Sequence, residues 1–163
     1  MKKKHSSGKL TNAVRMVEAA GFNYEIMEYD APDGFLDGVS VAEALGQNPD
    51  QTFKTLLTVG ASGDNYVCVI PVARELDLKK AAKQFGEKKL ERLLSKKITQ
   101  VTGYIKGGCS PVGMKKLFAT AIDSSALKFD SIMVSAGKVG MQMKVPLEAL
   151  MEITGAGLAD LTK

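Results

Sequence analysis

Three segments of the chain hold residues whose types and spacing could carry chemistry. Lys54 is the one charged residue in the β-branched run "TFKTLLTV", "GGCSPVG" spans residues 107–113, and "SAGKVGMQ" spans residues 135–142. A lysine ammonium can anchor a phosphate or a developing oxyanion. Glycines let a backbone approach a ligand closely and offer its N–H groups. These segments are therefore candidates for a ligand site made of a cation and backbone donors.

Each segment also has a purely structural interpretation. Strand alternation places Lys54 on one face with Leu56, where a lone lysine can simply end at a solvated edge of a sheet. The 135–142 segment on its own is typical of a hairpin. The glycine loop lacks both the GK[ST] ending of a phosphate-binding P-loop and the GxGxxG spacing, so it matches a nucleotide cradle poorly. Pro111 is expected to make its turn rigid.

Cys109, within the glycine loop, raises the alternative of a thiol nucleophile. A reactive cysteine needs a base or a positive environment, which Lys106 or Lys115 could supply. The one histidine is His5, near the N-terminus, so an ordinary Ser-His or Cys-His couple would need a base from the tail. A structural zinc site usually needs about four Cys or His ligands. We therefore expect neither a metal nor a cofactor.

The composition is that of a globular protein with a basic surface. The chain has 163 residues, of which 45% are hydrophobic and 25% charged, and we expect one domain over residues 1–163 with residues 1–9 as a mobile basic arm. No window approaches the roughly 20 apolar residues of a membrane span, and the N-terminus lacks a secretory pattern, so we expect a cytoplasmic protein. The net charge is +4, with lysine clusters at residues 2–4, 79–83 and 88–97. These runs are either solvated helix faces or contacts to nucleic acid, and the presence of three such runs favours nucleic acid.

Hydrophobic periodicity predicts a mixed α+β fold. The expected helices span residues 11–21, 40–46, 76–86, 87–94 and 146–155, and the expected strands span residues 22–30, 52–60, 66–72, 117–123, 131–137 and 141–146. Thr11 is a plausible N-cap, Ser40 and Glu43 form a possible capping box, and residues 61–65 suit a hairpin turn. The order lacks the regular βαβα alternation of a Rossmann unit. It favours a mixed, largely antiparallel sheet covered by helices.

The chain resembles a known family in segments that fall in the same order and spacing. "NPDQTFKTLL", "TGYIKGGCSPVGMKK" and "VSAGKVGMQMKV" are similar to the YbaK/EbsC-type aminoacyl-tRNA deacylases, relatives of the editing domain in prolyl-tRNA synthetase. The likeness runs from about Asn12 to about Asp160 and is strongest to the Cys-tRNA(Pro) deacylases. It implies a curled mixed sheet surrounded by helices. It also implies hydrolysis of Cys-tRNA(Pro) in trans.

The resemblance also implies site residues and partners. The residues it implies as catalytic are Lys54, Tyr29, Gly107 and Gly108, and those it implies as substrate-binding are Ser110, Pro111, Ser135, Ala136, Gly137 and Gln142. The family is understood to use no metal and no protein nucleophile, because the thiol of the substrate cysteine attacks its own ester. The implied partners are aminoacylated tRNA(Pro) and prolyl-tRNA synthetase, with no membrane and no DNA.

Two positions depart from the family pattern. Ala136 stands where the family often has glycine, and Gln142 stands where it often has aspartate. We expect Ala136 to narrow the pocket by a methyl group and Gln142 to keep hydrogen-bonding capacity without a charge. Three alternatives stay open: a deacylase for another small amino acid, a non-catalytic module that binds tRNA or a synthetase, and a thiol-dependent hydrolase built on Cys109.

Overall fold

The computed structural model describes residues 10–31 and 36–163 and contains two sheets. The three-stranded sheet is antiparallel in the order β1 (Glu25–Glu28), β7 (Met141–Pro146), β6 (Ser131–Lys138). The five-stranded sheet has the order β4 (Leu90–Arg92), β2 (Phe53–Gly60), β3 (Asn65–Pro71), β5 (Ala119–Asp123), β8 (Gly157–Ala159). Only the β3–β5 and β5–β8 pairs are parallel. The predicted mixed, largely antiparallel fold class is confirmed.

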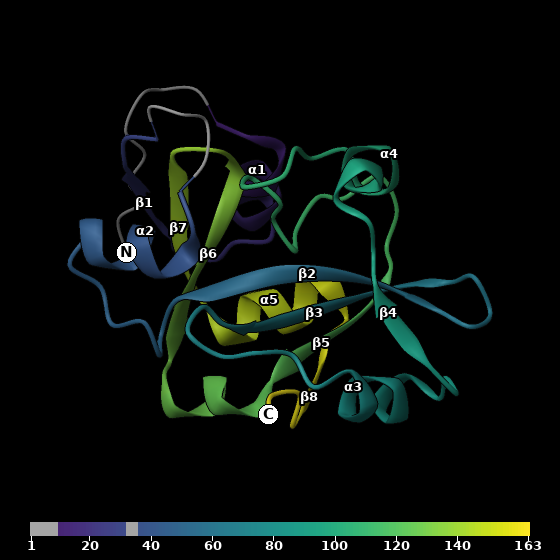
Figure 1. Cartoon of the computed structure of the whole chain (residues 1–163). Coiled ribbons are helices and arrows are strands. Elements are labelled where there is room, and N and C mark those ends of the chain that lie inside the picture. The colour runs from purple at the N-terminus through teal and green to yellow at the C-terminus, as the bar shows by residue number, and fades with distance from the viewer. Residues whose placement is uncertain (1–9, 32–35) are drawn as a thin grey trace.

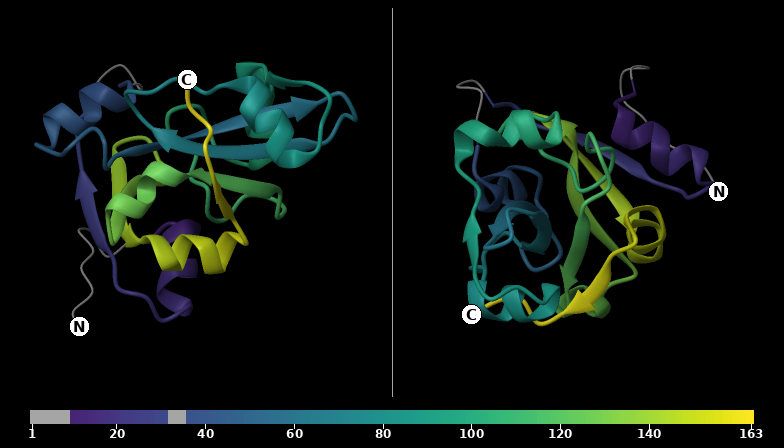
Figure 2. Two further views of the ribbon diagram at one scale, coloured as in Figure 1. Left: turned by 90° about the horizontal axis from the view of Figure 1, so that it is seen from below. Right: turned by 90° about the vertical axis from the view of Figure 1, so that its right-hand side faces the viewer.

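Helices cover both faces of the five-stranded sheet (Figures 1 and 2). The helices of the described residues are α1 (Asn12–Ala19), α2 (Gly38–Ala44), α3 (Leu78–Phe85), α4 (Ile98–Thr102) and α5 (Leu147–Thr154), with 3-10 turns η1 (Ser95–Lys97) and η2 (Ser124–Lys128), and those on the two faces of this sheet are α3 and α5. Strand β3 shows why two layers form. Its residues Val67 and Val69 join the core with α1 and α5, whereas Cys68 and Ile70 join the core under α3. A strand buried on both faces reads as a continuous apolar run, as "YVCVIPV" does.

The two sheets pack on a shared hydrophobic core and are joined by one backbone bridge among the described residues. Thr52, next to β2, forms a parallel bridge with Met133 of β6, and the Met133 N–H donates to the Gln51 carbonyl at 3.0 Å. From this bridge β6 crosses β2 and carries β7 away from the five-stranded sheet (Figure 1). On the same side, β4 pairs with β2 only at Thr58–Gly60. The stretch of β2 between these two pairings forms part of the site.

The predicted helix at residues 87–94 is wrong. Residues 90–92 form β4, whose Leu90 is buried and pairs with Gly60. The Glu87 carboxylate accepts hydrogen bonds from Ser62 and from the Tyr66 hydroxyl, the latter at 2.6 Å, which ties the segment to the β2–β3 hairpin. Pairing with a sheet edge therefore outweighs the helical propensity of "EKKLERLL".

The helix start expected at Ser40 is also wrong, because α2 begins at Gly38 with Asp37 as its N-cap. An Asp37 carboxylate oxygen accepts from the Ser40 N–H at 2.9 Å, so the capping residue lies three residues before the predicted start. The Thr11 cap is confirmed by a 3.1 Å hydrogen bond from the Val14 N–H to its hydroxyl. The basic arm at residues 1–9 lies outside the described residues. Within the described residues, no helix is long and apolar enough to cross a membrane.

Candidate functional site

A cavity of about 360 Å³ opens where the two sheets separate. Its walls come from β2, from α2 and Asp37 before it, from the segment that follows β4, and from the loop before Ser110. Five of the residues proposed from the sequence line it together: Tyr29, Lys54, Gly107, Ser135 and Gln142. Four of the five lie outside β2, so strands distant in sequence converge here. A volume of this size is typical of a small-molecule site.

Lys54 lies in β2 and is half-buried at the cavity wall. Its ammonium donates to the Val72 carbonyl at 3.2 Å. Burial lowers the pKa of Lys54, and the positive charge of Arg92 adds to that effect. Among the described residues, no carboxylate lies within salt-bridge distance of this ammonium. It is a partly desolvated cation that an anionic ligand would stabilise.

Gly107 brings backbone to the cavity from the glycine loop. Its φ is +88°, a conformation that side-chain-bearing residues rarely adopt, so this position requires glycine. Gly108 is buried and is not among the described residues that line the cavity. A Cβ on Gly108 would lie within 3.0 Å of the Lys138 and Val139 backbone, so the loop rests directly on the β6–β7 turn. Neither Ser110 nor Pro111 is among the described lining residues, and both are buried in support of the loop.

The β6–β7 hairpin supplies Ser135 and Gln142, which face each other in its register. The Ser135 hydroxyl accepts from the Gly137 N–H at 3.1 Å, which shapes the bulge at the end of β6. Ala136 is fully buried in the core and is not among the described lining residues. The expected narrowing of the pocket by its methyl group is therefore wrong, because side chains on a strand alternate between faces. Gly137 likewise lies outside the lining, against Tyr104.

Cys109 lines the cavity, but its thiol is in a poor environment for a nucleophile. Burial raises the pKa of Cys109 to about 11, and that of Cys68 to about 12. The thiolate is the reactive form, so little of either cysteine is reactive near neutral pH. The geometry thus assigns Cys109 to the wall of the cavity and weakens the thiol-hydrolase alternative.

We therefore expect Cys109→Ala to keep at least about half of the wild-type kcat/KM, because the substitution removes no ionised group. The measurement is steady-state hydrolysis of the cysteinyl ester that the family resemblance implies as substrate, with Cys109→Ser as a second variant that preserves polarity. A loss of about 100-fold in both variants, at unchanged thermal stability, would restore Cys109 as a nucleophile.

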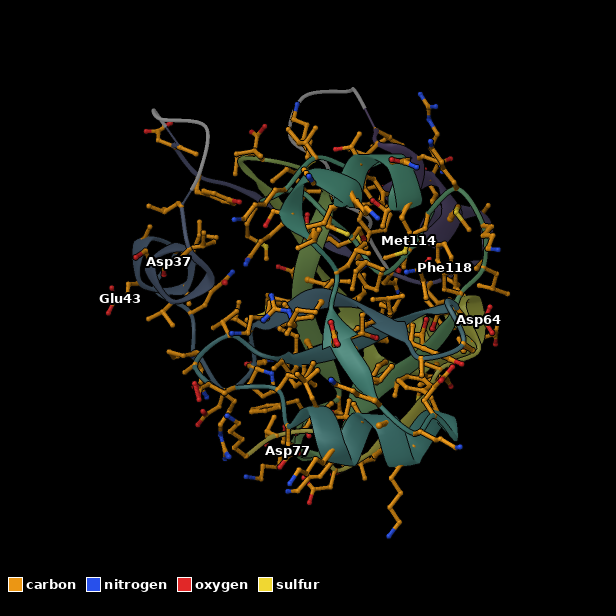
Figure 3. The ribbon with its side chains drawn as sticks, turned by 45° about the vertical axis from the view of Figure 1, so that its right-hand side comes forward. Asp37, Glu43, Asp64, Asp77, Met114 and Phe118 are labelled. Atoms are coloured by element: carbon orange, nitrogen blue, oxygen red, sulfur yellow. The ribbon has the colours of Figure 1, made fainter. Side chains whose placement is uncertain are left out.

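Sequence reasoning missed several residues of the cavity. Arg92 and Ser95 line it, but they fall in or just after the segment mistaken for a helix. Thr55 lines it from β2, and its buried hydroxyl has no hydrogen-bond partner among the described residues. Asp37 also lines it and lies at the N-terminal end of α2 (Figure 3). The hydrogen bond from the Ser40 N–H is the main reason that the pKa of Asp37 is lowered, so this carboxylate is already engaged as a cap.

The electrostatics of the cavity favour an anionic ligand. Its described lining holds the cations Lys54, Arg92 and Lys106 and one carboxylate, Asp37. Lys96 and Lys97 follow the cavity-lining residue Ser95 in η1, and both are exposed. Among the described residues no group of three or more His, Cys, Asp or Glu side chains could hold a metal ion.

Comparison with known proteins agrees with this arrangement. The aminoacyl-tRNA editing domain family matches residues 37–153. A protein of Enterococcus faecalis assigned as a Cys-tRNA(Pro)/Cys-tRNA(Cys) deacylase, EbsC, is 46% identical over 162 residues, covering 99% of this chain and 98% of that protein. A solved structure described as a trans-editing enzyme for prolyl-tRNA synthetase superposes with a TM-score of 0.80 at 26% identity, covering 95% of this chain and 99% of that one. The hypothetical protein APE2540 shares the fold with a TM-score of 0.82 at 22% identity, covering 91% and 97%.

Proposed function

Because the chain belongs to the aminoacyl-tRNA editing domain family, we propose that it is a trans-editing deacylase that hydrolyses cysteine from mischarged tRNA(Pro). The observation that carries the proposal is the half-buried cation Lys54, which shares one cavity with Tyr29, Gly107, Ser135 and Gln142. The similarity to the Enterococcus protein over nearly the full length supports cysteine as the amino acid.

The reaction needs no acid–base residue of the protein to begin. The substrate thiolate attacks the ester carbonyl carbon, forming a C–S bond and an oxyanion. The oxyanion collapses, the bond to the ribose oxygen breaks, and that oxygen takes a proton. Water then opens the cyclic thioester to give free cysteine. Holding thiol and carbonyl in this geometry can supply several kcal/mol, towards the roughly 7–11 kcal/mol available from ideal orientation.

The cavity residues have defined parts in this scheme. Lys54 compensates negative charge on the oxyanion or on the terminal nucleotide, and the backbone of Gly107, which lines the same cavity, supplies an N–H donor. Both act electrostatically in a partly dehydrated site, where such interactions are stronger than in water. The low ionised fraction expected for Cys109 is compatible with chemistry that uses the substrate's own thiol.

A panel of esters on one tRNA tests the proposal. We expect Cys-tRNA(Pro) to be hydrolysed rapidly, Ala- and Ser-tRNA(Pro) slowly, and Pro-tRNA(Pro) to stay intact. A protein that removes alanine as fast as cysteine would instead be a general deacylase for small amino acids. That alternative is favoured only by the neutral Gln142, which stands where the family often has a carboxylate.

The exposed cations beside the cavity predict salt-dependent tRNA binding. Neutralising phosphates releases counterions, so the logarithm of the affinity should fall linearly with the logarithm of salt concentration, by about 0.7–0.9 for each phosphate contact. Lys96→Glu/Lys97→Glu should weaken tRNA binding by about tenfold at low salt and reduce this slope. Fluorescence anisotropy with labelled tRNA(Pro) measures both quantities.

The matched control is Lys79→Glu/Lys83→Glu in α3, which changes charge equally. Helix α3 lies at the opposite end of the molecule from α4 (Figure 1), and Asp77 at its start is remote from Met114 (Figure 3). An equal loss of affinity in the two double variants would contradict a binding surface localised at the cavity.

Selection of tRNA(Pro) is proposed to come from a complex with prolyl-tRNA synthetase. Only 6% of the residues are aromatic, so few side chains are available to stack on bases. Weak, sequence-tolerant contacts to the tRNA backbone would then suffice in this protein. The similarity to a solved structure described as a trans-editing enzyme for that synthetase supports this partner.

A further inference from the structure

Strand β2 presents an unpaired backbone edge to the cavity. In an antiparallel pair the backbone groups of alternate residues point towards the partner strand. The Val72 N–H donates to the Thr52 carbonyl on the β3 side, whereas the Leu93 N–H donates to the Leu57 carbonyl and the Met133 N–H to the Gln51 carbonyl on the other side. Odd-numbered residues of this strand therefore direct their backbone groups away from β3.

Thr55 is the odd-numbered residue midway between the pairing of β2 with β6 and the pairing of β2 with β4. The bridge to β6 lies at Thr52, and the pairing with β4 begins at Thr58, apart from the Leu93 bond to Leu57. No described strand pairs with Thr55 on that side, and the residue lines the cavity. Among the described residues its N–H and C=O therefore have no strand partner, and they form a donor–acceptor pair at the cavity wall.

Two side chains there also have unsatisfied acceptors. The Thr55 Oγ1 and the Gln142 Oε1 are buried, and neither has a hydrogen-bond partner among the described residues. Gln142 is only 6% exposed and lines the cavity from β7, on the other sheet. A buried polar atom without a partner costs free energy, which a ligand that supplies N–H donors would recover.

We propose that this free edge of β2 binds the main-chain atoms of the aminoacyl group as one added strand residue, an inference that rests on the proposed deacylase function. The α-amino group donates to the Thr55 C=O and to the unpaired oxygens of Thr55 and Gln142. The ester carbonyl accepts from the Thr55 N–H. An aminoacyl ester fits because it carries an N–H donor and a C=O acceptor two bonds apart, as a strand residue does.

The arrangement makes a free α-amino group a requirement for hydrolysis. A 3-mercaptopropionyl ester keeps the thiol and the carbonyl but lacks the amino group, so the acceptors of Thr55 and Gln142 would stay buried and unpaired. Sites built around a polar group discriminate strongly against analogues that lack it. Esters of N-acylated amino acids, including peptidyl esters, would be disfavoured for the same reason.

The experiment compares cysteinyl-tRNA(Pro) with 3-mercaptopropionyl-tRNA(Pro), each rate being divided by that ester's uncatalysed hydrolysis. We expect the normalised kcat/KM of the wild-type protein to be about 100-fold lower for the ester without the amino group. Thr55→Val and Gln142→Leu should each lower the normalised kcat/KM for the cysteinyl ester by about tenfold more than they lower the value for the 3-mercaptopropionyl ester. Thr55→Ser should retain the wild-type preference.

Thr120→Val, in β5 and outside the described lining, is the matched control and should keep the wild-type ratio. Equal normalised rates for the two esters would overturn the proposal. Variants at positions 55 and 142 would also overturn it if they lowered the normalised kcat/KM of both esters equally, or if they kept the wild-type preference for the cysteinyl ester. A wild-type protein that hydrolyses neither ester would contradict the deacylase function itself.

Discussion

Lys54→Ala is expected to lower kcat/KM for Cys-tRNA(Pro) by about 100-fold or more, because removing one electrostatic group aimed at a developing oxyanion typically costs about 100- to 1,000-fold. The ammonium is the cation that β2 places in the wall of the cavity, which Gly107 of the glycine loop also lines. Single-turnover deacylation with enzyme in excess measures the loss.

The fold should survive this substitution. Burial lowers the pKa of Lys54, which means that the folded protein holds the charged form at a cost, and its ammonium donates a 3.2 Å hydrogen bond to the Val72 carbonyl. Lys144→Ala, on β7 and outside the described lining, is the control for removal of a partly buried lysine. A Lys54→Ala protein with unchanged thermal stability and near-normal turnover would exclude the proposed role.

Ser-tRNA(Pro) is expected to be hydrolysed at least about 100-fold more slowly than Cys-tRNA(Pro). The two substrates differ by one atom and have nearly the same size. A free thiol has a pKa of about 8.5, so a few per cent is thiolate at neutral pH, whereas a hydroxyl is hardly ionised. Rates should therefore rise with pH for the cysteinyl ester as its thiol ionises, after the uncatalysed hydrolysis has been subtracted.

Binding must be separated from chemistry in this comparison. Inhibition of Cys-tRNA(Pro) hydrolysis by excess Ser-tRNA(Pro) shows whether the serine ester enters the cavity. Equal turnover of the two esters would exclude attack by the substrate thiol. It would indicate instead a water molecule held near Lys54 and Gly107, with Gln142 as the first residue to test as its positioner.

The sequence predicted much of the fold because its local signals agree with the long-range packing. The Thr11 cap and the β2–β3 hairpin follow from side-chain hydrogen bonding and from turn residues near each other in the chain. The segment containing Leu90 and Arg92 was mistaken for a helix because its strand conformation depends on pairing with β2, about 30 residues earlier. That error removed Arg92 from the predicted site.

The site was predicted more by resemblance than by pattern. Lys54 alone is compatible with a solvated sheet edge, and only the family likeness joined it to Gly107 and Gln142, which the structure brings to one cavity. Thr55 was missed for a geometric reason. Among the described residues its backbone groups have no strand partner, because β6 and β4 pair with β2 on either side of it, and no local sequence pattern reports such a gap.

The central claim is that this cavity hydrolyses a cysteinyl ester catalytically. The most direct measurement is the release of free cysteine from radiolabelled Cys-tRNA(Pro) with the protein at about one hundredth of the substrate concentration, alongside Lys54→Ala. We expect many turnovers by the wild-type protein and a rate near the uncatalysed one for the variant. No release of cysteine above the uncatalysed rate by wild-type protein that still binds tRNA would exclude catalysis at this cavity and leave a non-catalytic binding module.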